Sequence, residues 1–452
     1  MKSDNPGAWT PGALGTRNPS STEAREPWSP AGAGRADPEG FPPLSARGAL
    51  GQLVLVVAIV VLVAIATHTT DLLIVIAAIL IMVMLHELGH FATAKWSRMK
   101  VTEYFFGFGP RLWSVRRGET EYGIKAIPAG GYVKILGMTN TEEVDPADEP
   151  RTYREQPFHN RLLVAVAGSA MHAVMAFVLL WGLLVFIGTA PSNVVAINSF
   201  APLAHGLDPA RTAGLRAGDV VERVDGKRVT SSDQLVKDVS TTRGRPVTML
   251  VERHGHPVTV IVTPHVAAGS SVQCPGGHAA CIGVEIGPGP DQRSNPLVAI
   301  GRSVVDLGRT ISATVSALGA FFSLHGLSSY LHDLTNSKAA DQAAKSGKRI
   351  ESIYGAVRTA TQGAKAGFGA LVEVLVAIIV SLGLLNLLPM LPFDGGHAAV
   401  AVYERIRSRR GRHYHADVTK LMPVVYAFVL FVGFIVVTSL YLDITHPVAN
   451  PF

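Results

Sequence analysis

Five long apolar runs, separated by polar segments, dominate the pattern of the chain. Each is close in length to the roughly 20 residues that a helix needs to cross a lipid bilayer. The runs cover residues 49–67, 71–94, 162–188, 367–391 and 421–441. They predict a multi-pass α-helical membrane protein with four core transmembrane helices and one extra N-terminal helix. The polar break Thr67–Asp71 predicts a tight turn between the first two helices, and an interruption within a single helix is the alternative.

The composition supports a membrane protein and argues against a nucleic-acid partner. Hydrophobic residues make up 48% of the 452 residues and charged residues only 16%. The net charge is +6, but the basic residues lie beside the apolar runs and are not interleaved with aromatic residues. The surface of a lipid bilayer explains them better than nucleic acid does.

The first 48 residues differ from the rest of the chain. They are rich in Pro, Gly, Ser and Ala with almost no apolar clustering, so they cannot bury enough surface to offset the entropy of ordering. We expect a disordered cytoplasmic tail over 1–48. A signal peptide is not expected, because the apolar stretch begins late and no small-residue cleavage site follows it.

Two basic loops predict the orientation in the membrane. The loop between the second and third runs contains "KWSRMK", "RLWSVRRGE", Arg151, Arg154 and Arg161. The loop between the last two runs contains "ERIRSRRGR". Loops rich in Lys and Arg remain in the cytoplasm, so the region from about 190 to 366 is expected on the extracytoplasmic side.

The first part of the segment 194–287, from Val194 to about Pro264, alternates short β-rich pieces with glycine turns. Part of it, "AGLRAGDVVERVDGKRV" from Ala213 to Val229, resembles a PDZ domain of the bacterial protease-associated type. Gly214, Gly218 and Asp219 match the turn of such domains, and Asp225-Gly226 matches the following hairpin. We therefore expect an inserted extracytoplasmic PDZ domain, and an unspecified small β domain is the alternative.

Two cysteines, Cys274 and Cys281, lie close together in a polar stretch. The spacing suits either a small disulfide in an oxidising compartment or two unrelated thiols, and both interpretations stay open. It is not the CxxC spacing of a zinc knuckle.

The segment after the expected PDZ domain has two parts. From 298 to 322 apolar residues recur at helical spacing, which predicts an amphipathic helix lying on the outer membrane face or packing on the PDZ domain. Residues 323–366 are polar, and we expect an irregular extracytoplasmic linker there.

The second apolar run ends in "HELGH", which fits the pattern HExxH. Residues four apart share a helix face, so His86 and His90 can present imidazole nitrogens to one zinc ion. In such motifs the glutamate, here Glu87, takes a proton from the attacking water. Structural histidines are the alternative, but polar groups in a hydrocarbon segment cost on the order of 2 to 3 kcal/mol each and are functional by default.

A catalytic zinc needs a third protein ligand, and the best candidate lies in "NLLPMLPFDGGH" at the end of the fourth run. Pro389 and Pro392 must disrupt the helix there. Gly395-Gly396 permits a turn that brings the Asp394 carboxylate inward.

The ordered combination of HExxH and NxxPxxPxDGG resembles the site-2 protease family of intramembrane zinc metalloproteases. "FGFGP" (Phe106–Pro110) and "GIKAIPAGGYVKILGM" (Gly123–Met138) are similar to its RseP branch, and "ETEYGIKAIPAGGYVK" (Glu119–Lys134) resembles its actinobacterial members. The resemblance covers about residues 71–441. It implies an N-terminal protease core over 71–188 and a C-terminal protease core over 367–441.

The resemblance also implies roles for individual residues. His86, His90 and Asp394 would bind Zn²⁺, and Glu87 would activate the water. Asn386 matches an asparagine that holds the substrate backbone or stabilises the developing oxyanion, with a helix-packing hydrogen bond as the alternative.

Three further segments are interpreted beside the family pattern. "GGYVKILGM" matches a membrane-associated β-hairpin whose strand edge extends the substrate, and an ordinary loop hairpin is the alternative. His172 replaces a family asparagine, so it contacts substrate, approaches the metal or packs between helices. "HYH" at His413–His415 is expected to be a solvated surface rather than a metal site.

The sequence thus predicts a zinc metalloendopeptidase of the bacterial plasma membrane, with its active site near the cytoplasmic side. As the resemblance implies, it would cleave transmembrane segments of single-pass proteins, such as anti-sigma factors, after a first-site cut, with the PDZ domain as a size filter. A catalytically silent scaffold has no need of Glu87. A metal transporter would repeat such polar groups on several helices.

Overall fold

The computed structural model describes residues 46–450 apart from short gaps at 139–141, 191–193, 202, 204–205, 267–273, 275–277, 348, 409–413 and 415. The expected tail therefore lies outside the described residues up to position 45. So do the two histidines of the "HYH" segment, His413 and His415.

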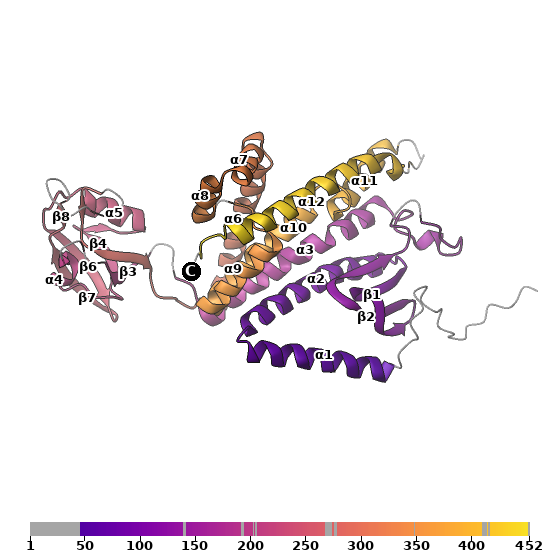
Figure 1. The fold of residues 1–452 in the computed structure, drawn as a ribbon, viewed down its shortest axis with the longest axis horizontal. Helices are drawn as coiled ribbons and strands as arrows, with labels where there is room; N and C mark the ends of the chain where they lie inside the picture. The colour runs from indigo at the N-terminus through magenta and orange to yellow at the C-terminus, as the bar shows by residue number, and fades with distance from the viewer. Residues whose placement is uncertain are drawn as a thin grey trace, which may run out of the picture. The chain divides into compact units, whose positions relative to one another are not determined.

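The five apolar runs form long helices (Figure 1). They are α1 (Ala46–Ala66), α2 (Thr70–Trp96), α3 (Phe158–Gly182, continued by a π-helical turn Leu183–Ile187), α10 (Phe368–Asn386) and α12 (Met422–Thr445). Within the described part of the chain, four helical segments are long and apolar enough to span a membrane. These are Thr70–Trp96, Phe158–Ile187, Phe368–Asn386 and Thr419–Thr445, which contain the four runs predicted as core spans. That the protein crosses the membrane four times stays a prediction.

The first two apolar runs form two helices. Residues 67–69 make a turn between α1 and α2, in which the Thr67 hydroxyl donates to the carbonyl of Val63. The tight turn predicted at the polar break is therefore confirmed. That α1 crosses the membrane stays a prediction.

Helices α2, α3 and α10 share one apolar core. Its buried residues are Met82, Met175, Ala176, Leu180, Leu183, Val372, Val376, Ile379 and Val380. Helix α6 (Pro296–Phe321) packs on this core through Leu307 and Ile311. The amphipathic helix predicted over 298–322 is thus present, and it packs on α3 and α10.

The loop between α2 and α3 contains a curled antiparallel hairpin, β1 (Val101–Arg117) and β2 (Thr120–Ile135). Phe105 is paired with both Tyr132 and Gly123, so the first part of β1 lies between two segments of β2. The segment 131–135 is therefore an outer strand of this small sheet. A 3-10 turn, Glu149–Arg151, follows before α3.

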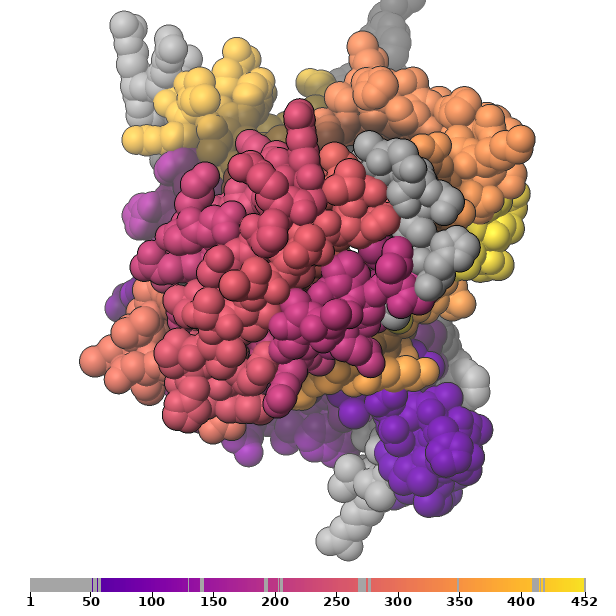
Figure 2. Space-filling model, turned by 90° about the vertical axis from the view of Figure 1, so that its left-hand side faces the viewer, coloured from indigo at the N-terminus to yellow at the C-terminus, as the bar shows by residue number. Residues whose placement is uncertain are grey.

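Residues 195–288 form a separate β-rich domain. Its sheet has the strand order β10-β3-β4-β6-β7, with β5 beside β4. The elements are β3 (Val195–Phe200), α4 (Pro209–Thr212), β4 (Val220–Val224), β5 (Lys227–Arg228), α5 (Ser232–Ser240), β6 (Val247–Arg253), β7 (His256–Val262) and β10 (Val284–Pro288). The space-filling view shows its outer surface in magenta to red (Figure 2).

The predicted turn and hairpin of this domain are both formed. Gly214 and Gly218 have φ of +90° and +91°, and Asp225-Gly226 turns between β4 and β5 with φ of +47° and +78°. Only glycine adopts such angles without strain, which explains why it occupies most of these positions.

A disulfide joins Cys274 and Cys281 beside the short pair β8 (His265–Val266) and β9 (Ala280–Cys281). Of the two alternatives left open by the spacing, the structure therefore contains the disulfide.

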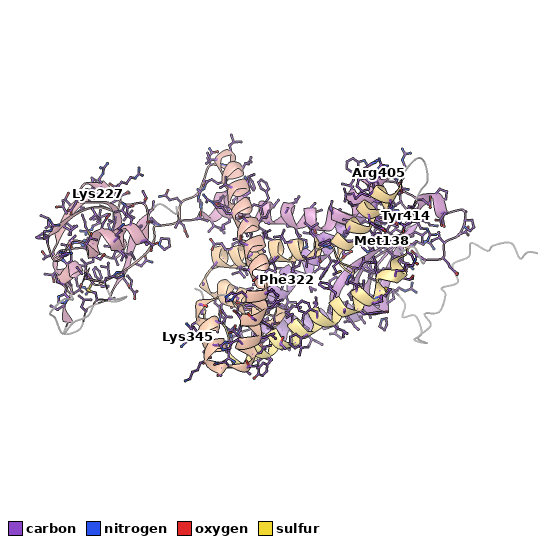
Figure 3. All side chains as sticks on the ribbon, turned by 90° about the horizontal axis from the view of Figure 1, so that it is seen from above. Met138, Lys227, Phe322, Lys345, Arg405 and Tyr414 are labelled. Atoms are coloured by element: carbon purple, nitrogen blue, oxygen red, sulfur yellow. A yellow bond between two sulfur atoms is a disulfide. The ribbon has the colours of Figure 1, made fainter. Side chains whose placement is uncertain are left out.

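Most of the described residues in 323–366 are helical, so the expectation of an irregular linker is wrong. They form α7 (Leu324–Thr335), α8 (Ser337–Ser346) and α9 (Ile353–Ala366). Each helix begins after a residue whose side chain accepts a backbone N–H, namely Ser323, Asn336 and Ser352. Lys345 on α8 and Phe322 at the end of α6 mark this region in Figure 3.

Candidate metal centre

Helix α2 places His86 and His90 on one face, one turn apart, with only 8% and 4% of their surface exposed. The Nδ1 of His90 lies 2.8 Å from the carbonyl oxygen of Val164 on α3. Only a protonated Nδ1 can bond to a carbonyl oxygen, so this contact leaves the Nε2 lone pair of His90 available to a metal.

The third side chain comes from a break between α10 and α11 (Asp394–Arg407). Helix α10 ends at Asn386, and residues 387–393 turn back before Asp394 begins α11. The turn is tight enough to require glycine. A Cβ on Gly395 would lie 2.3 Å from the carbonyl oxygen of Leu387, and one on Gly396 would lie 2.5 Å from the Leu391 nitrogen.

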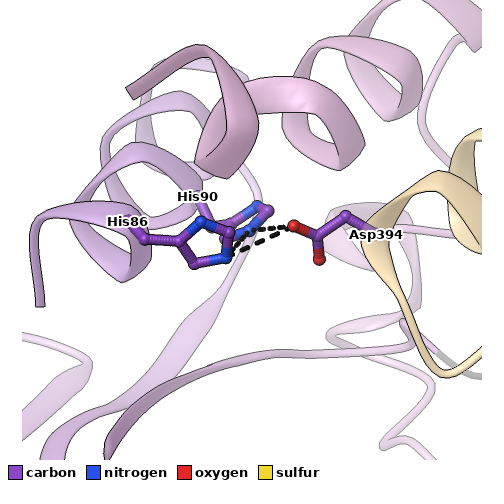
Figure 4. A group of neighbouring side chains, drawn as sticks. All are labelled: His86, His90 and Asp394. Atoms are coloured by element: carbon purple, nitrogen blue, oxygen red, sulfur yellow. Dashed lines mark hydrogen bonds and ion pairs between the residues drawn. The ribbon is translucent and has the colours of Figure 1, made fainter. Parts of the chain in front are cut away.

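The three predicted ligands meet at one point (Figure 4). The Oδ2 of Asp394 lies 3.3 Å from His86 Nε2 and 3.1 Å from His90 Nε2, and the two Nε2 atoms are 3.3 Å apart. A tetrahedral zinc with ligand bonds of 2.0–2.1 Å requires donor separations of about 3.3 Å. The residues therefore fit zinc, and three ligands leave one position for water or substrate.

Close approach of α3 to the centre depends on glycine. A Cβ on Gly168 would lie 2.3 Å from His86 Cε1 and 2.4 Å from His90 Nε2. A Cβ on Gly89 would lie 2.6 Å from the carbonyl oxygen of Ala167. Real Cβ contacts are essentially never this short. The imidazoles are thus packed directly against the backbone of α3.

Glu87 points from α2 towards the hairpin. Its Oε2 accepts a hydrogen bond from the backbone N–H of Val133 at 3.1 Å. Val133 lies in the outer strand 131–135, and a Cβ on the neighbouring Gly131 would be 2.6 Å from Met84 Sδ. The predicted hairpin thus lies against the catalytic motif, with its outer strand facing Glu87.

Two more predicted residues lie on the helices around the centre. Asn386 is the half-buried last residue of α10. The His172 ring is buried edge-on to His86, with centroids 5.0 Å apart, and its Nδ1 lies 2.9 Å from the carbonyl oxygen of Ile379. This contact joins α3 to α10, so it is the helix-packing bond offered as one alternative for His172.

An ion-pair network fastens the hairpin turn to α2. The Oε1 of Glu119 lies 2.7 Å from the Nζ of Lys95. The same carboxylate accepts two hydrogen bonds from the guanidinium of Arg151, at 2.7 and 2.9 Å. The bonds from Arg151 and then those from Lys95 outweigh the effect of burial and lower the pKa of Glu119 to about 2. The charged residues of this loop therefore also stabilise the contact between the hairpin and α2.

Sequence reasoning missed two features of the site. No sequence pattern marked Gly168 as important, because the need for glycine there comes from two histidines about 80 positions away. Arg161 was counted as a cytoplasmic loop charge, but the structure places it within α3, buried and paired with Glu404 at 2.6 Å. The other basic residues of the two loops still support the orientation argument.

Comparison with known proteins agrees with the geometry. The model of peptidase family M50 matches residues 74–432. The chain is 36% identical to the zinc metalloprotease Rip1 of Mycobacterium tuberculosis over 412 residues, which covers 83% of this chain and 96% of that protein. It is 32% identical to the zinc metalloprotease Rip1 of Mycolicibacterium smegmatis over 411 residues, which covers 82% and 96%. The chain therefore belongs to peptidase family M50, the site-2 proteases, and is a membrane-embedded zinc metalloprotease.

Proposed function

We propose that this protein is an intramembrane endopeptidase that cleaves transmembrane segments of single-pass membrane proteins. The observation that carries the proposal is the meeting of His86, His90 and Asp394 at zinc-ligand separations. The two histidines lie on α2, which is long and apolar enough to span a bilayer, and Asp394 follows the break at the end of another such helix, α10. Polar groups placed there serve a reaction that takes place at membrane depth.

The steps of peptide-bond hydrolysis are assigned to the zinc site and to two side chains. His86, His90 and Asp394 would hold the zinc ion, which would supply a Lewis acid to polarise the scissile carbonyl and lower the pKa of the attacking water. Glu87 accepts the proton of that water and delivers it to the leaving amine. Asn386, at the end of α10, donates its amide N–H to the substrate backbone or to the developing oxyanion.

The outer strand 131–135 is the docking site for the unwound substrate. A transmembrane helix satisfies its backbone groups internally, so it opens only where substitute partners exist. A strand edge provides a row of N–H and C=O groups for this purpose. In support, Val133 on this strand lies within hydrogen-bonding distance of Glu87.

The β domain acts as a PDZ-type size filter on the extracytoplasmic side. Its sheet, its helix α5 and its glycine turns suit such a domain. The disulfide supports an oxidising compartment. The substrates proposed are membrane-anchored regulators such as anti-sigma factors, whose bulky ectodomains are removed by a first cut.

The test is cleavage of a panel of single-pass substrates by the protein reconstituted in liposomes. Glu87→Gln should reduce the rate by about 10² to 10⁴, because the general base is lost while the fold remains. Glu373→Gln, at an exposed glutamate of α10, is the matched control and should cleave at the wild-type rate. If Glu87→Gln cleaved the substrates as fast as the wild-type protein, the proposed mechanism would be wrong.

The orientation and the filter have their own tests. A cysteine introduced at exposed Lys227 of the β domain should react with an impermeant maleimide added outside intact cells. Labelling only after lysis would place the domain in the cytoplasm. If the filter operates, substrates with a short ectodomain are cleaved faster than the same substrates carrying a folded ectodomain, and equal rates would exclude it.

A further inference from the structure

A second buried polar cluster lies at the opposite end of α11 from the metal centre and is not used by the chemistry above. Its centre is the ion pair between Arg161 at the start of α3 and Glu404 near the end of α11, 2.6 Å apart. The two residues are only 8% and 2% exposed. Glu404 lies ten residues after Asp394 on the same helix, a distance of about 15 Å. The pair therefore fastens the far end of the helix that begins with a proposed zinc ligand.

Further contacts hold the two side chains in place. The Oε1 of Glu404 accepts the backbone N–H of Ala416 at 2.6 Å. The guanidinium of Arg161 lies 5.2 Å from the ring centre of Tyr153, whose hydroxyl donates to the Arg161 carbonyl at 3.1 Å. The same Tyr153 ring meets His397, three residues after Asp394, edge-on at 6.4 Å. Both ends of α11 are thus connected to one group of side chains.

Tyr153 also connects this cluster to the hairpin and the HExxH helix. It is buried with Ala94 of α2, Ile135 of β2 and Val164 of α3, whose carbonyl orients His90. Its backbone N–H donates to the carbonyl of Leu136 at 2.8 Å. The four elements that build the site therefore converge on this one ring.

Stability alone does not account for a charged pair at this position. Desolvation offsets most of the attraction in a buried ion pair, and well-packed apolar residues often stabilise a fold as well or better. What an ion pair with further hydrogen bonds does supply is one defined geometry. Here the geometry it fixes is the angle and register of α11 against α3, on which the position of the Asp394 carboxylate depends.

We propose that Arg161 and Glu404 are positioning residues that hold Asp394 at the zinc centre through α11. The proposal rests on the ligand set proposed above. It predicts that breaking the pair weakens zinc binding in protein that is still folded. A purely structural pair would change stability and leave the affinity of the folded protein unaltered.

The experiment measures zinc affinity of the full-length protein in detergent, by competition with a chelator of known affinity. Arg161→Met and Glu404→Gln should each raise the zinc dissociation constant about tenfold or more, the range seen when support of metal ligands is lost. The double variant Arg161→Met/Glu404→Met restores packing without charge, and it should bind zinc as weakly as the single variants do. Wild-type affinity in this double variant would overturn the positioning role.

The chain offers a matched control pair. Arg349 and Asp443 form a buried ion pair at 2.5 Å, with side chains 1% and 3% exposed, at the end of α12. Arg349→Met should lower the unfolding temperature but leave zinc affinity unchanged. An equal loss of affinity in Arg349→Met would mean that any buried ion pair has this effect, which overturns the proposal.

Two outcomes separate this inference from the proposed function. If Asp394→Asn loses zinc while Arg161→Met and Glu404→Gln bind it as wild type does, the positioning role is wrong and the ligand set stands. If Asp394→Asn keeps wild-type affinity, the ligand set itself is wrong and the inference fails with it. Should Glu404→Gln not fold, Glu404→Asp replaces it and should show a smaller rise in the dissociation constant.

Discussion

The β domain and the helices around the metal centre use burial in opposite ways. The buried residues of the β domain are mostly apolar, such as Val247, Met249 and Val251, and its buried Asp219 is paired with Arg253. Around the metal centre the buried set includes His86, His90, His172, Arg161 and Glu404. The interior of the β domain serves stability. Around the metal centre the interior contains polar side chains, which close packing and hydrogen bonds must keep in position.

This difference predicts which measurement responds to a change in each region. In the β domain a lost contact should lower the free energy of unfolding and leave the peptide-cleavage rate per folded molecule unchanged. Around the centre, a change of a single atom should reduce that rate while the helices, which are held by many apolar contacts, remain folded.

Removal of the metal should have the largest effect. A strong chelator should abolish cleavage entirely, and added zinc should restore it, because the ligands alone cannot polarise the carbonyl. The unfolding transition of the β domain, measured in the same samples by calorimetry, should not move. A shift of that transition on chelation would mean that the two regions are not independent.

Gly168→Ala should reduce the cleavage rate by about 10² or more. The added methyl group would occupy the space of the His86 and His90 imidazoles and displace them from Asp394. Zinc content, measured by elemental analysis, should fall in parallel. Gly182→Ala is the control on the same helix, because its Cβ would meet Phe186 at an ordinary 3.9 Å. Equal losses in both variants would point to helix packing in general.

Met249→Ala should lower the stability of the β domain by about 2–5 kcal/mol, because it opens a cavity among fully buried residues. Differential scanning calorimetry measures the loss. Cleavage of a substrate without an ectodomain should keep its wild-type rate. Ile261→Ala, at a residue 64% exposed on β7, should change the stability by less than about 0.5 kcal/mol.

The smallest effect is expected from Glu119. Its pKa is about 2 in the folded protein against a usual 4.5, so its contribution to stability is complete above pH 4.5 and is lost as the pH falls towards 2. Partial exposure limits that contribution to about 1 kcal/mol or less. Unfolding temperatures of wild type and Glu119→Gln should therefore differ slightly at pH 6 and converge near pH 2. A difference that grows on acidification would contradict the assignment.

Much of the architecture and of the candidate site could be predicted from local pattern. Membrane spans follow from composition over about 20 residues, and HExxH places two side chains on one face of any helix. Asp394 could be found because Pro389, Pro392 and the two glycines that follow it predict a broken helix at membrane depth. Each of these signals lies within a short window of sequence.

The missed features depend on contacts between distant segments. Arg161 and Glu404 are separated by 243 positions, and no periodicity links them. The helices in 323–366 are a different case, because a local signal was present. Asn336 before α8, Gly347 after it and Ser352 before α9 are typical helix boundaries, and the polar composition between them concealed short amphipathic helices.

The hydrogen bond between Glu87 and Val133 has a consequence for the timing of catalysis. The amide that Glu87 engages belongs to the strand on which an unwound substrate would be laid. A substrate carbonyl that pairs with this N–H competes with the carboxylate for it, since one amide hydrogen bonds well to a single acceptor. Arrival of the peptide would then release Oε2 of Glu87 from Val133, so that this oxygen would become free to move only when a peptide lies on the strand.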